Sequence, residues 1–170
     1  MTNLRDLILW CTFGLPTIFQ GWLLGSGALM VRRATKPRFI GPILVTTKPD
    51  PDATYTTTLA GWMNLGPWAS AQTIWHENVH LEQYLEFNVL AGIQAACIIG
   101  PFWSWWWALG WWASSGIIWL GPNYLVALIR YKARDVSWTD ACYYWTSHEQ
   151  DAYARTLCEF DGTRSRWEKT

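Results

Sequence analysis

Two long uncharged stretches divide the chain. The first covers residues 7–31 and the second covers residues 87–129. A transmembrane helix needs about 20 apolar residues, so the first stretch predicts an anchor helix. The second stretch is about twice as long as one crossing requires. It therefore predicts a hydrophobic helical hairpin, with a break near Gly100–Pro101 or between Gly110 and Gly116.

The polar segment between these stretches carries strand signals. Residues 39–47 and 54–59 are rich in β-branched residues and flank the turn Lys48–Asp52, which predicts a short β-hairpin. A helix is expected to begin after this hairpin, between Pro67 and Ser70, because proline suits the first helical turn.

The second polar segment predicts another helix, because residues 143–157 contain no Gly or Pro. The expected fold is mainly α, of the α+β class, with one domain and added membrane-type helices. Its expected segments are an anchor helix (1–31), the β-hairpin with the first site helix (32–87), a Trp-rich hydrophobic hairpin (88–129), a second site helix (130–160) and a polar tail (161–170).

The first site helix contains the sequence HExxH, formed by His76, Glu77 and His80. Side chains at i and i+4 share one helix face, so both imidazoles can reach one ion at about 2 Å. A carboxylate beside them can take a proton from a metal-activated water. The motif predicts Zn²⁺ bound by His76 and His80, with Glu77 as the catalytic base.

A zinc site that activates water needs a third protein ligand and one open position. Of two known arrangements, the downstream His of the HExxHxxGxxH pattern is missing, and a distant Glu on a second helix fits this sequence better. Glu149 lies in the second site helix, and the small Ala152 one turn later allows two helices to approach closely. We therefore expect Glu149 to be the third zinc ligand.

These motifs resemble those of the gluzincin metallopeptidases. The matched elements are HExxH at 76–80 and E-x-x-A at 149–152, and Gln83–Tyr84 resembles the residues that follow HExxH in the small soluble members. The chain is similar to a minigluzincin, or to a reduced relative of the membrane gluzincins, which include the CAAX prenyl proteases and the heat-shock membrane proteases. The resemblance covers residues 63–157 and implies a membrane-associated zinc peptidase acting on peptide or protein substrates.

The chain departs from the family pattern at Tyr153, where membrane gluzincins usually carry an Asp that orients a ligating His. Such support commonly matters 10- to 100-fold in affinity or activity. Asp151, Gln83 or a backbone carbonyl could replace it. Tyr153 could instead donate a hydrogen bond to the tetrahedral intermediate, or only pack. The resemblance also implies an edge strand that pairs with extended substrate, for which residues 60–65 are the candidate, unless the hairpin is purely structural.

The site and the hydrophobic hairpin constrain each other. His80 precedes the hairpin and Glu149 follows it, so the chain must cross the membrane twice or re-enter. The N-terminal stretch favours an uncleaved anchor, because it lacks an A-x-A cleavage site. Basic residues follow both stretches, which places both polar regions in the cytoplasm and predicts three crossings with a cytoplasmic site. These residues are Arg32, Arg33, Lys36, Arg38, Arg130, Lys132 and Arg134.

Composition narrows the partners. The 170 residues include 15 Trp and carry no net charge, so nothing indicates a nucleic-acid-binding surface. The Trp residues between 105 and 112 are too dense for one interfacial ring. They predict either a loop among lipid headgroups or a contact within an oligomer or a larger assembly, such as a virion or secretion apparatus. The four Cys show no CxxC spacing, which argues against a disulfide framework or a cysteine zinc site.

Three other functions compete with the peptidase. A di-iron site would need a second ExxH motif, which the sequence lacks. A site-2-type intramembrane protease would take an Asp ligand from an LDG-like element, which Phe160–Gly162 matches only weakly. The third is a non-catalytic component of a membrane or virion assembly that keeps a structural or vestigial metal site. A fourth protein ligand such as His148 or Asp151 would indicate that third function.

Overall fold

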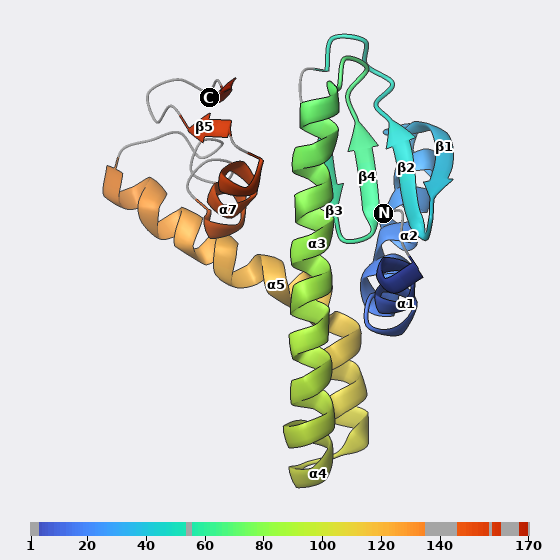
Figure 1. Cartoon of the computed structure of the whole chain (residues 1–170), viewed down its shortest axis with the longest axis vertical. Coiled ribbons are helices and arrows are strands. Elements are labelled where there is room, and N and C mark those ends of the chain that lie inside the picture. The colour runs from blue at the N-terminus through green and yellow to red at the C-terminus, as the bar shows by residue number, and fades with distance from the viewer. Residues whose placement is uncertain (1–3, 54–55, 135–145, 157, 161–166, 170) are drawn as a thin grey trace.

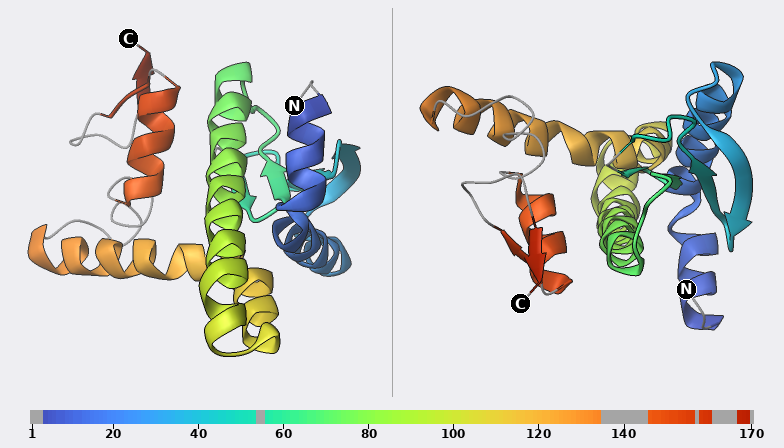
Figure 2. Two further views of the ribbon diagram at one scale, coloured as in Figure 1. Left: turned by 60° about the horizontal axis from the view of Figure 1, so that its bottom comes forward. Right: turned by 90° about the horizontal axis from the view of Figure 1, so that it is seen from above.

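A computed structural model describes residues 4–53, 56–134, 146–156, 158–160 and 167–169. One long helix forms the axis of the molecule (Figure 1). It consists of α3 (Ala71–Gln94), a π-helical turn η1 (Ala95–Ile99) and the short α4 (Gly100–Phe102). A β-sheet lies on one side of its upper half and α7 (Ser147–Arg155) lies on the other, as both views in Figure 2 show.

Helix α3 begins where the sequence predicts. Ser70 is its N-cap, and the Ser70 hydroxyl accepts a hydrogen bond of 3.1 Å from the Thr73 backbone N–H. This bond satisfies one of the donors that the first helical turn leaves open. The HExxH motif starts less than two turns later, so the cap fixes the part of the helix that carries the first metal ligand.

The four-stranded sheet has the order β1-β2-β4-β3. β2 and β4 are parallel, and the other two pairs are antiparallel. The bounds are β1 Thr35–Ile40, β2 Ile43–Thr47, β3 Thr57–Leu59 and β4 Trp62–Leu65. Val45 and Met63 from its two central strands pack with Ile18 and with Leu81 of α3, and so form the core of this part of the molecule.

The α+β class is confirmed, but three strand predictions are wrong. The predicted hairpin of residues 39–47 with 54–59 does not form, because β2 pairs with β1 and β4 and not with β3. Residues 39–47 are not one strand, because the chain reverses at Gly41–Pro42 between β1 and β2. Gly41 has a φ of 57°, which favours glycine and marks the turn. Residues 60–65 are not an edge strand either, since β4 lies between β2 and β3. The edge strands are β1 and β3. Residues 54 and 55 of the predicted strand 54–59 lie outside the described residues.

The first uncharged stretch forms two helices, α1 (Leu4–Thr12) and α2 (Leu15–Met30), separated at Phe13–Gly14. Helix α2 packs on the sheet at Gly21, where a Cβ atom would come within 2.2 Å of the Gly61 backbone. The Gly61 N–H also donates a hydrogen bond of 2.9 Å to the Thr17 carbonyl of α2. This stretch is therefore part of the packed unit, rather than one continuous anchor helix.

The second uncharged stretch forms a helical hairpin. The chain turns at Trp103–Ser104 after α4 and returns as α5 (Trp105–Arg134). We call residues 87–116 the stem. Between Gly116 and Gly121 the direction of α5 changes by 54°, and the rest of the helix runs sideways toward α7 (Figure 1). A small hairpin of β5 (Cys158–Phe160) and β6 (Trp167–Lys169) follows α7.

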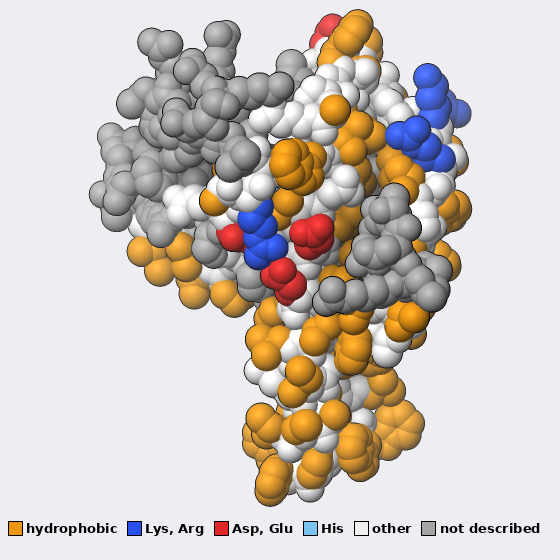
Figure 3. All heavy atoms as spheres, viewed as in Figure 1, with side chains coloured by type: hydrophobic (Ala, Val, Ile, Leu, Met, Phe, Trp, Pro, Cys, Tyr) orange, Lys and Arg blue, Asp and Glu red, His pale blue; other side chains and the backbone are white. Residues whose placement is uncertain are grey.

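The stem is apolar on its surface. Figure 3 shows hydrophobic side chains over its visible face, whereas the acidic and basic side chains in that view lie above it. Within the described part of the chain, the helix Ala71–Phe102 is long and apolar enough to span a membrane, and the two parts of α5 would be a second such span if taken as one. The prediction of a hydrophobic hairpin near Gly100–Pro101 thus has its counterpart in the structure, but the N-terminal helices do not meet the same criterion.

Polar side chains join the stem to the rest of the molecule. The amide of Asn88 is fully buried, and its Nδ2 donates a hydrogen bond to the Thr17 hydroxyl, 2.5 Å away. The Asn88 Oδ1 accepts a hydrogen bond from the Ser115 hydroxyl. These bonds connect α2, α3 and α5 at the level where the stem begins.

Candidate metal centre

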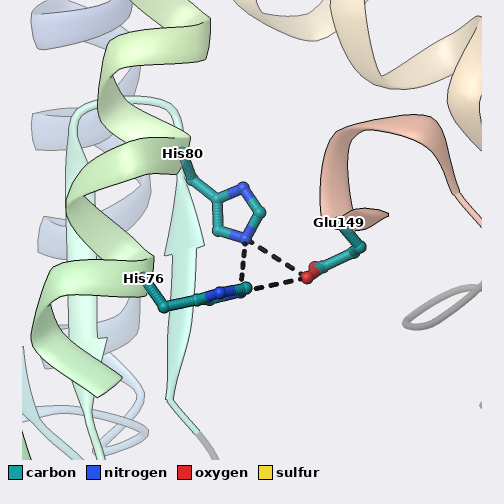
Figure 4. Close-up of side chains that lie close together, drawn as sticks. All are labelled: His76, His80 and Glu149. Atoms are coloured by element: carbon teal, nitrogen blue, oxygen red, sulfur yellow. Dashed lines mark hydrogen bonds and ion pairs between the residues drawn. The ribbon is translucent and has the colours of Figure 1, made fainter. Parts of the chain in front are cut away.

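The three predicted metal ligands meet between α3 and α7 (Figure 4). His76 and His80 lie one turn apart on α3, and Glu149 extends from the first turn of α7. All three side chains are buried. Helix α7 thus brings a carboxylate to His76 across 73 positions of sequence.

The ligand atoms form a small triangle. The Nε2 atom of His76 lies 3.1 Å from Nε2 of His80 and 3.1 Å from Oε2 of Glu149. The third side, from Nε2 of His80 to Oε2 of Glu149, is 3.3 Å. A tetrahedral ion with nitrogen and oxygen ligands at about 2.0 to 2.1 Å keeps those ligands about 3.3 to 3.4 Å apart. The triangle therefore fits one small metal ion, and the triad could hold it.

No fourth His, Cys, Asp or Glu joins the triad in the part of the chain that the structure describes. His148 is a neighbour, but its Nε2 lies 3.8 Å from the other carboxylate oxygen of Glu149. The Oδ2 atom of Asp151 accepts hydrogen bonds from Gln83 and Arg155. Three protein ligands are the number found in metal sites that activate water, whereas structural zinc sites are usually closed by a fourth.

Glu77 is buried beside the triad on α3. Its Oε1 accepts a hydrogen bond from the hydroxyl of Thr56, which directly precedes β3. Its Oε2 is buried and has no hydrogen-bond partner among the described residues. A buried carboxylate oxygen without a donor is costly, so this atom is available for a proton or a water molecule. No sequence pattern indicates the Thr56 contact, because it joins a loop to a helix.

The charges of the triad are coupled to one another. Burial by itself favours the neutral form of Glu149, but the charge of His80 and hydrogen bonds from both ligand histidines outweigh burial and lower the pKa of Glu149 to about 2. Burial lowers the pKa of His148 to about 4, against the opposite effect of Glu149. Burial also lowers the pKa of Lys48 to about 8, and the nearby charge of Glu77 acts against that shift. Burial by itself lowers the pKa of His80, but the charge and hydrogen bond of Glu149 raise it to about 9. At neutral pH and without a metal, an ionised Glu149 therefore faces a protonated His80, with a neutral His148 beside them.

Tyr153 lies one turn after Glu149 and packs on a ligand. Its ring centroid is 4.1 Å from that of His76, with 33° between the ring planes. The contact restricts the orientation of the His76 imidazole. Ala152, between these two residues of α7, is fully buried, as expected for the small residue that lets two helices approach.

Gln83 and Asp151 lie behind the ligands, at two of the positions considered for the missing family Asp. The Gln83 Oε1 lies 2.9 Å from Nδ1 of His80, and its Nε2 donates to Oδ2 of Asp151 at 2.7 Å. The same Asp151 oxygen accepts from Nε of Arg155 at 2.9 Å, and the Arg155 guanidinium makes two bonds to Glu86. Gln83 lies three residues after His80 and was one of the predicted replacements for the missing Asp. The Arg155–Glu86 pair was not predicted.

Comparisons with known proteins add no family assignment. No protein-family model matches the chain, and neither a curated protein nor a solved structure matches it. The resemblance to gluzincins thus depends on the short motifs and on the geometry of the triad.

Proposed function

We propose that the chain is a membrane-associated zinc metallopeptidase. The observation that carries this proposal is the buried triangle of His76, His80 and Glu149, with sides of 3.1 to 3.3 Å and no fourth ligand among the described residues. Two histidines and a carboxylate are a ligand set that zinc accepts in hydrolytic sites. The adjacent Glu77, with one unsatisfied oxygen, supplies the basic group that such chemistry needs.

The roles of the residues follow from their positions. A zinc ion bound here would lower the pKa of a water ligand to near 7 and polarise a peptide carbonyl. Glu77 would take the proton from that water on Oε2 and later deliver it to the leaving amine. Thr56 would hold the other oxygen of Glu77 in place. Tyr153, whose ring lies against His76, is the candidate donor to the developing oxyanion.

The substrate would be a peptide or protein segment in extended conformation. β3 pairs with β4 on one side and with no second strand in the described part of the sheet. It follows Thr56, the residue bonded to Glu77. A peptide that added to this edge through backbone hydrogen bonds would pass close to the catalytic carboxylate. β3 therefore takes the role that the sequence assigned to residues 60–65.

We propose that the stem inserts into a lipid bilayer. From Phe87 to Phe102 the first arm is about 24 Å long at 1.5 Å per residue, which is most of the roughly 30 Å hydrocarbon core. Its tip exposes Trp103, Trp106 and Trp107, and Trp prefers the interface between lipid and water. The stem would thus place these indoles near the far headgroups. The second part of α5, which exposes Leu125 and Ile129, would lie along the near interface.

The metal centre would face the cytoplasm. Arg32, Arg33, Lys36 and Arg38 are exposed on the sheet side of the molecule, away from the stem. Positive residues flanking membrane segments concentrate on the cytoplasmic side. Because the stem returns to its starting side, the ligands on α3 and α7 remain on this same side.

The test uses the full-length protein purified in detergent, native and Glu77→Gln, with metal content measured by elemental analysis. Both proteins are incubated with a mixture of unstructured peptides, and new termini are identified by mass spectrometry. We expect about one zinc per chain in both, and cleavage by the native protein only. His80→Ala should lose both zinc and cleavage.

Two results would contradict the proposal. Equal cleavage by native protein and Glu77→Gln would assign the activity to a contaminant. Zinc binding without cleavage of any peptide would instead favour the non-catalytic alternative, a component of a membrane or virion assembly with a structural metal site.

A further inference from the structure

The orientation of the Gln83 amide follows from its hydrogen bonds. Gln83 is buried on α3, and its Nε2 donates to the His148 carbonyl oxygen at 2.9 Å and to Oδ2 of Asp151 at 2.7 Å. Both partners are acceptors, so they bind the NH₂ end of the amide. The carbonyl end, Oε1, must then face His80, where it lies 2.9 Å from Nδ1.

This orientation determines which nitrogen of His80 can bind a metal. An amide oxygen can only accept a hydrogen bond, so Nδ1 of His80 must carry the proton. When His80 binds a metal as a neutral ring, its lone pair then lies on Nε2, the atom that faces His76 and Glu149 in the triad. Gln83 thereby favours the tautomer that a metal ligand needs.

Asp151 holds the amide from the other side. Its Oδ2 accepts from Gln83 and from Nε of Arg155. Arg155 is in turn bound by two hydrogen bonds, of 3.0 and 3.2 Å, to the carboxylate of Glu86 on α3. The bonds form one chain from a surface ion pair to a metal ligand, and they join α7 to α3 beside the triad. The helix that supplies Glu149 thus also supplies the group that fixes Gln83.

We propose that Gln83, held by Asp151, is the positioning residue for His80, and that this amide relay replaces the carboxylate that would otherwise bind the ligand histidine directly. The inference rests on the proposed metal centre. Partners of ligand histidines typically affect metal affinity 10- to 100-fold. The relay uses a neutral amide beside the ligand and places the negative charge of Asp151 one residue farther away, where Arg155 balances it.

The experiment measures zinc affinity of the full-length protein by competition with a chelator. Gln83→Met keeps the approximate volume of the side chain and removes its hydrogen bonds, and Gln150→Met on the exposed face of α7 is the matched control. We expect about 10- to 100-fold weaker zinc binding for Gln83→Met and native affinity for Gln150→Met. The unfolding temperature of each metal-free protein is measured alongside, because a purely structural role would lower that temperature and not the affinity selectively.

A double variant provides the rescue. In Gln83→Glu with Asp151→Asn, the carboxylate at position 83 can accept from His80 and the amide at position 151 can donate to that carboxylate. We expect it to recover part of the lost zinc affinity, because the carboxylate at position 83 cannot replace the hydrogen bond to the His148 carbonyl. Gln83→Glu alone also places two carboxylates together and should recover none.

The outcomes separate this inference from the proposed function. Native affinity in Gln83→Met, or a loss that follows only the unfolding temperature and is not rescued, overturns the relay and leaves the peptidase proposal intact. Zinc binding with the expected losses but without peptidase activity overturns the proposed function and supports the relay. Absence of zinc binding by the native protein overturns both.

Discussion

The two halves of one continuous helix have opposite patterns of burial. In the upper half of α3, His76, Glu77 and Gln83 are polar and buried, at 8%, 6% and 4% exposure. In the stem, Leu90 and Ile98 are apolar and exposed, at 51% and 57%. In water, folding buries apolar groups and leaves polar ones outside. The upper half departs from the second part of this rule and the stem departs from the first, so each half needs a partner that the chain itself does not supply.

The two burial patterns indicate different kinds of partner. Buried polar groups are tolerated when they are hydrogen-bonded or coordinate a metal, and the upper half converges on a site that could hold one. Large exposed apolar surfaces mark contacts with a membrane or another protein, and the stem presents such a surface over most of its length. Changes in the upper half should therefore affect metal binding and leave association with lipid or a protein partner unchanged. Changes in the stem should have the opposite effects.

The largest expected effect is on metal binding in the upper half. Glu149→Ala removes one of three ligands, and we expect zinc affinity to fall by more than the 10- to 100-fold that is typical of an outer partner. Association with lipid should not change, because the stem is untouched. Elemental analysis after mild chelation measures the zinc content, and Glu82→Ala, which removes an exposed carboxylate of α3, is the control. Equal zinc retention in both variants would show that the triad is not a metal centre.

The next effect concerns the tip of the stem. Replacing Trp103, Trp106 and Trp107 by Gln removes three indoles that are 73% to 83% exposed. An aromatic side chain buries 150 to 250 Å², which at about 25 cal/mol per Å² is worth at most about 6 kcal/mol each if lipid covered it completely. We expect at least about tenfold weaker binding to phospholipid vesicles in flotation assays, with unchanged zinc content. Replacement by Phe should retain most of the binding.

The same variant distinguishes lipid from protein partners. If native protein fails to float with vesicles but forms an oligomer in detergent that the three Gln substitutions dissociate, the stem is a protein contact. That result would favour the assembly component over the membrane-inserted enzyme.

A smaller effect is expected where the two halves meet. Asn88→Ala leaves the hydroxyls of Thr17 and Ser115 without their buried partner. Such a loss costs about 1 to 3 kcal/mol in the free energy of unfolding. Thermal unfolding in detergent should show the loss, while zinc affinity stays near native because the triad lies two turns or more away along α3. A parallel fall in zinc affinity would mean that the hydrogen bonds of Asn88 and metal binding at the triad are coupled.

The sequence predicts the site better than the sheet. Helical spacing determines that His76 and His80 share a face, and the absence of Gly and Pro around Glu149 permits a second helix. The meeting of these helices was an inference from the motif, since nothing in the spacing places α7 beside α3. The strands were harder because the reversal at Gly41 interrupts a β-branched run, and strand order depends on long-range pairing. The parallel pairing of β2 with β4 is one such contact, and it leaves β3 at one edge of the sheet, with β1 at the other.

The hydrogen-bond partners were the least accessible to prediction. The Thr56 contact to Glu77 joins the start of β3 to α3, and the Arg155 bonds to Glu86 join α7 to α3. Such contacts depend on packing distances that the sequence pattern does not contain. The hydrophobic hairpin was predictable because the absence of charge over residues 87–129 is a property of composition alone.

The smallest expected effect lies at the start of α3. Ser70 accepts a hydrogen bond from the Thr73 N–H, and Ser70→Ala should lower the free energy of unfolding by about 1 kcal/mol. Ser70→Gly should cost only a few tenths of a kcal/mol, because glycine is tolerated at this position. The loss would fray the first turn, which lies closer to His76 than to His80. We therefore expect a zinc affinity within about threefold of native, since fraying falls off within the first turn. Chemical denaturation measures the stability change, and chelator competition measures the affinity. A tenfold loss of affinity in Ser70→Ala would mean that the upper half of α3 forms fully only when its metal is bound.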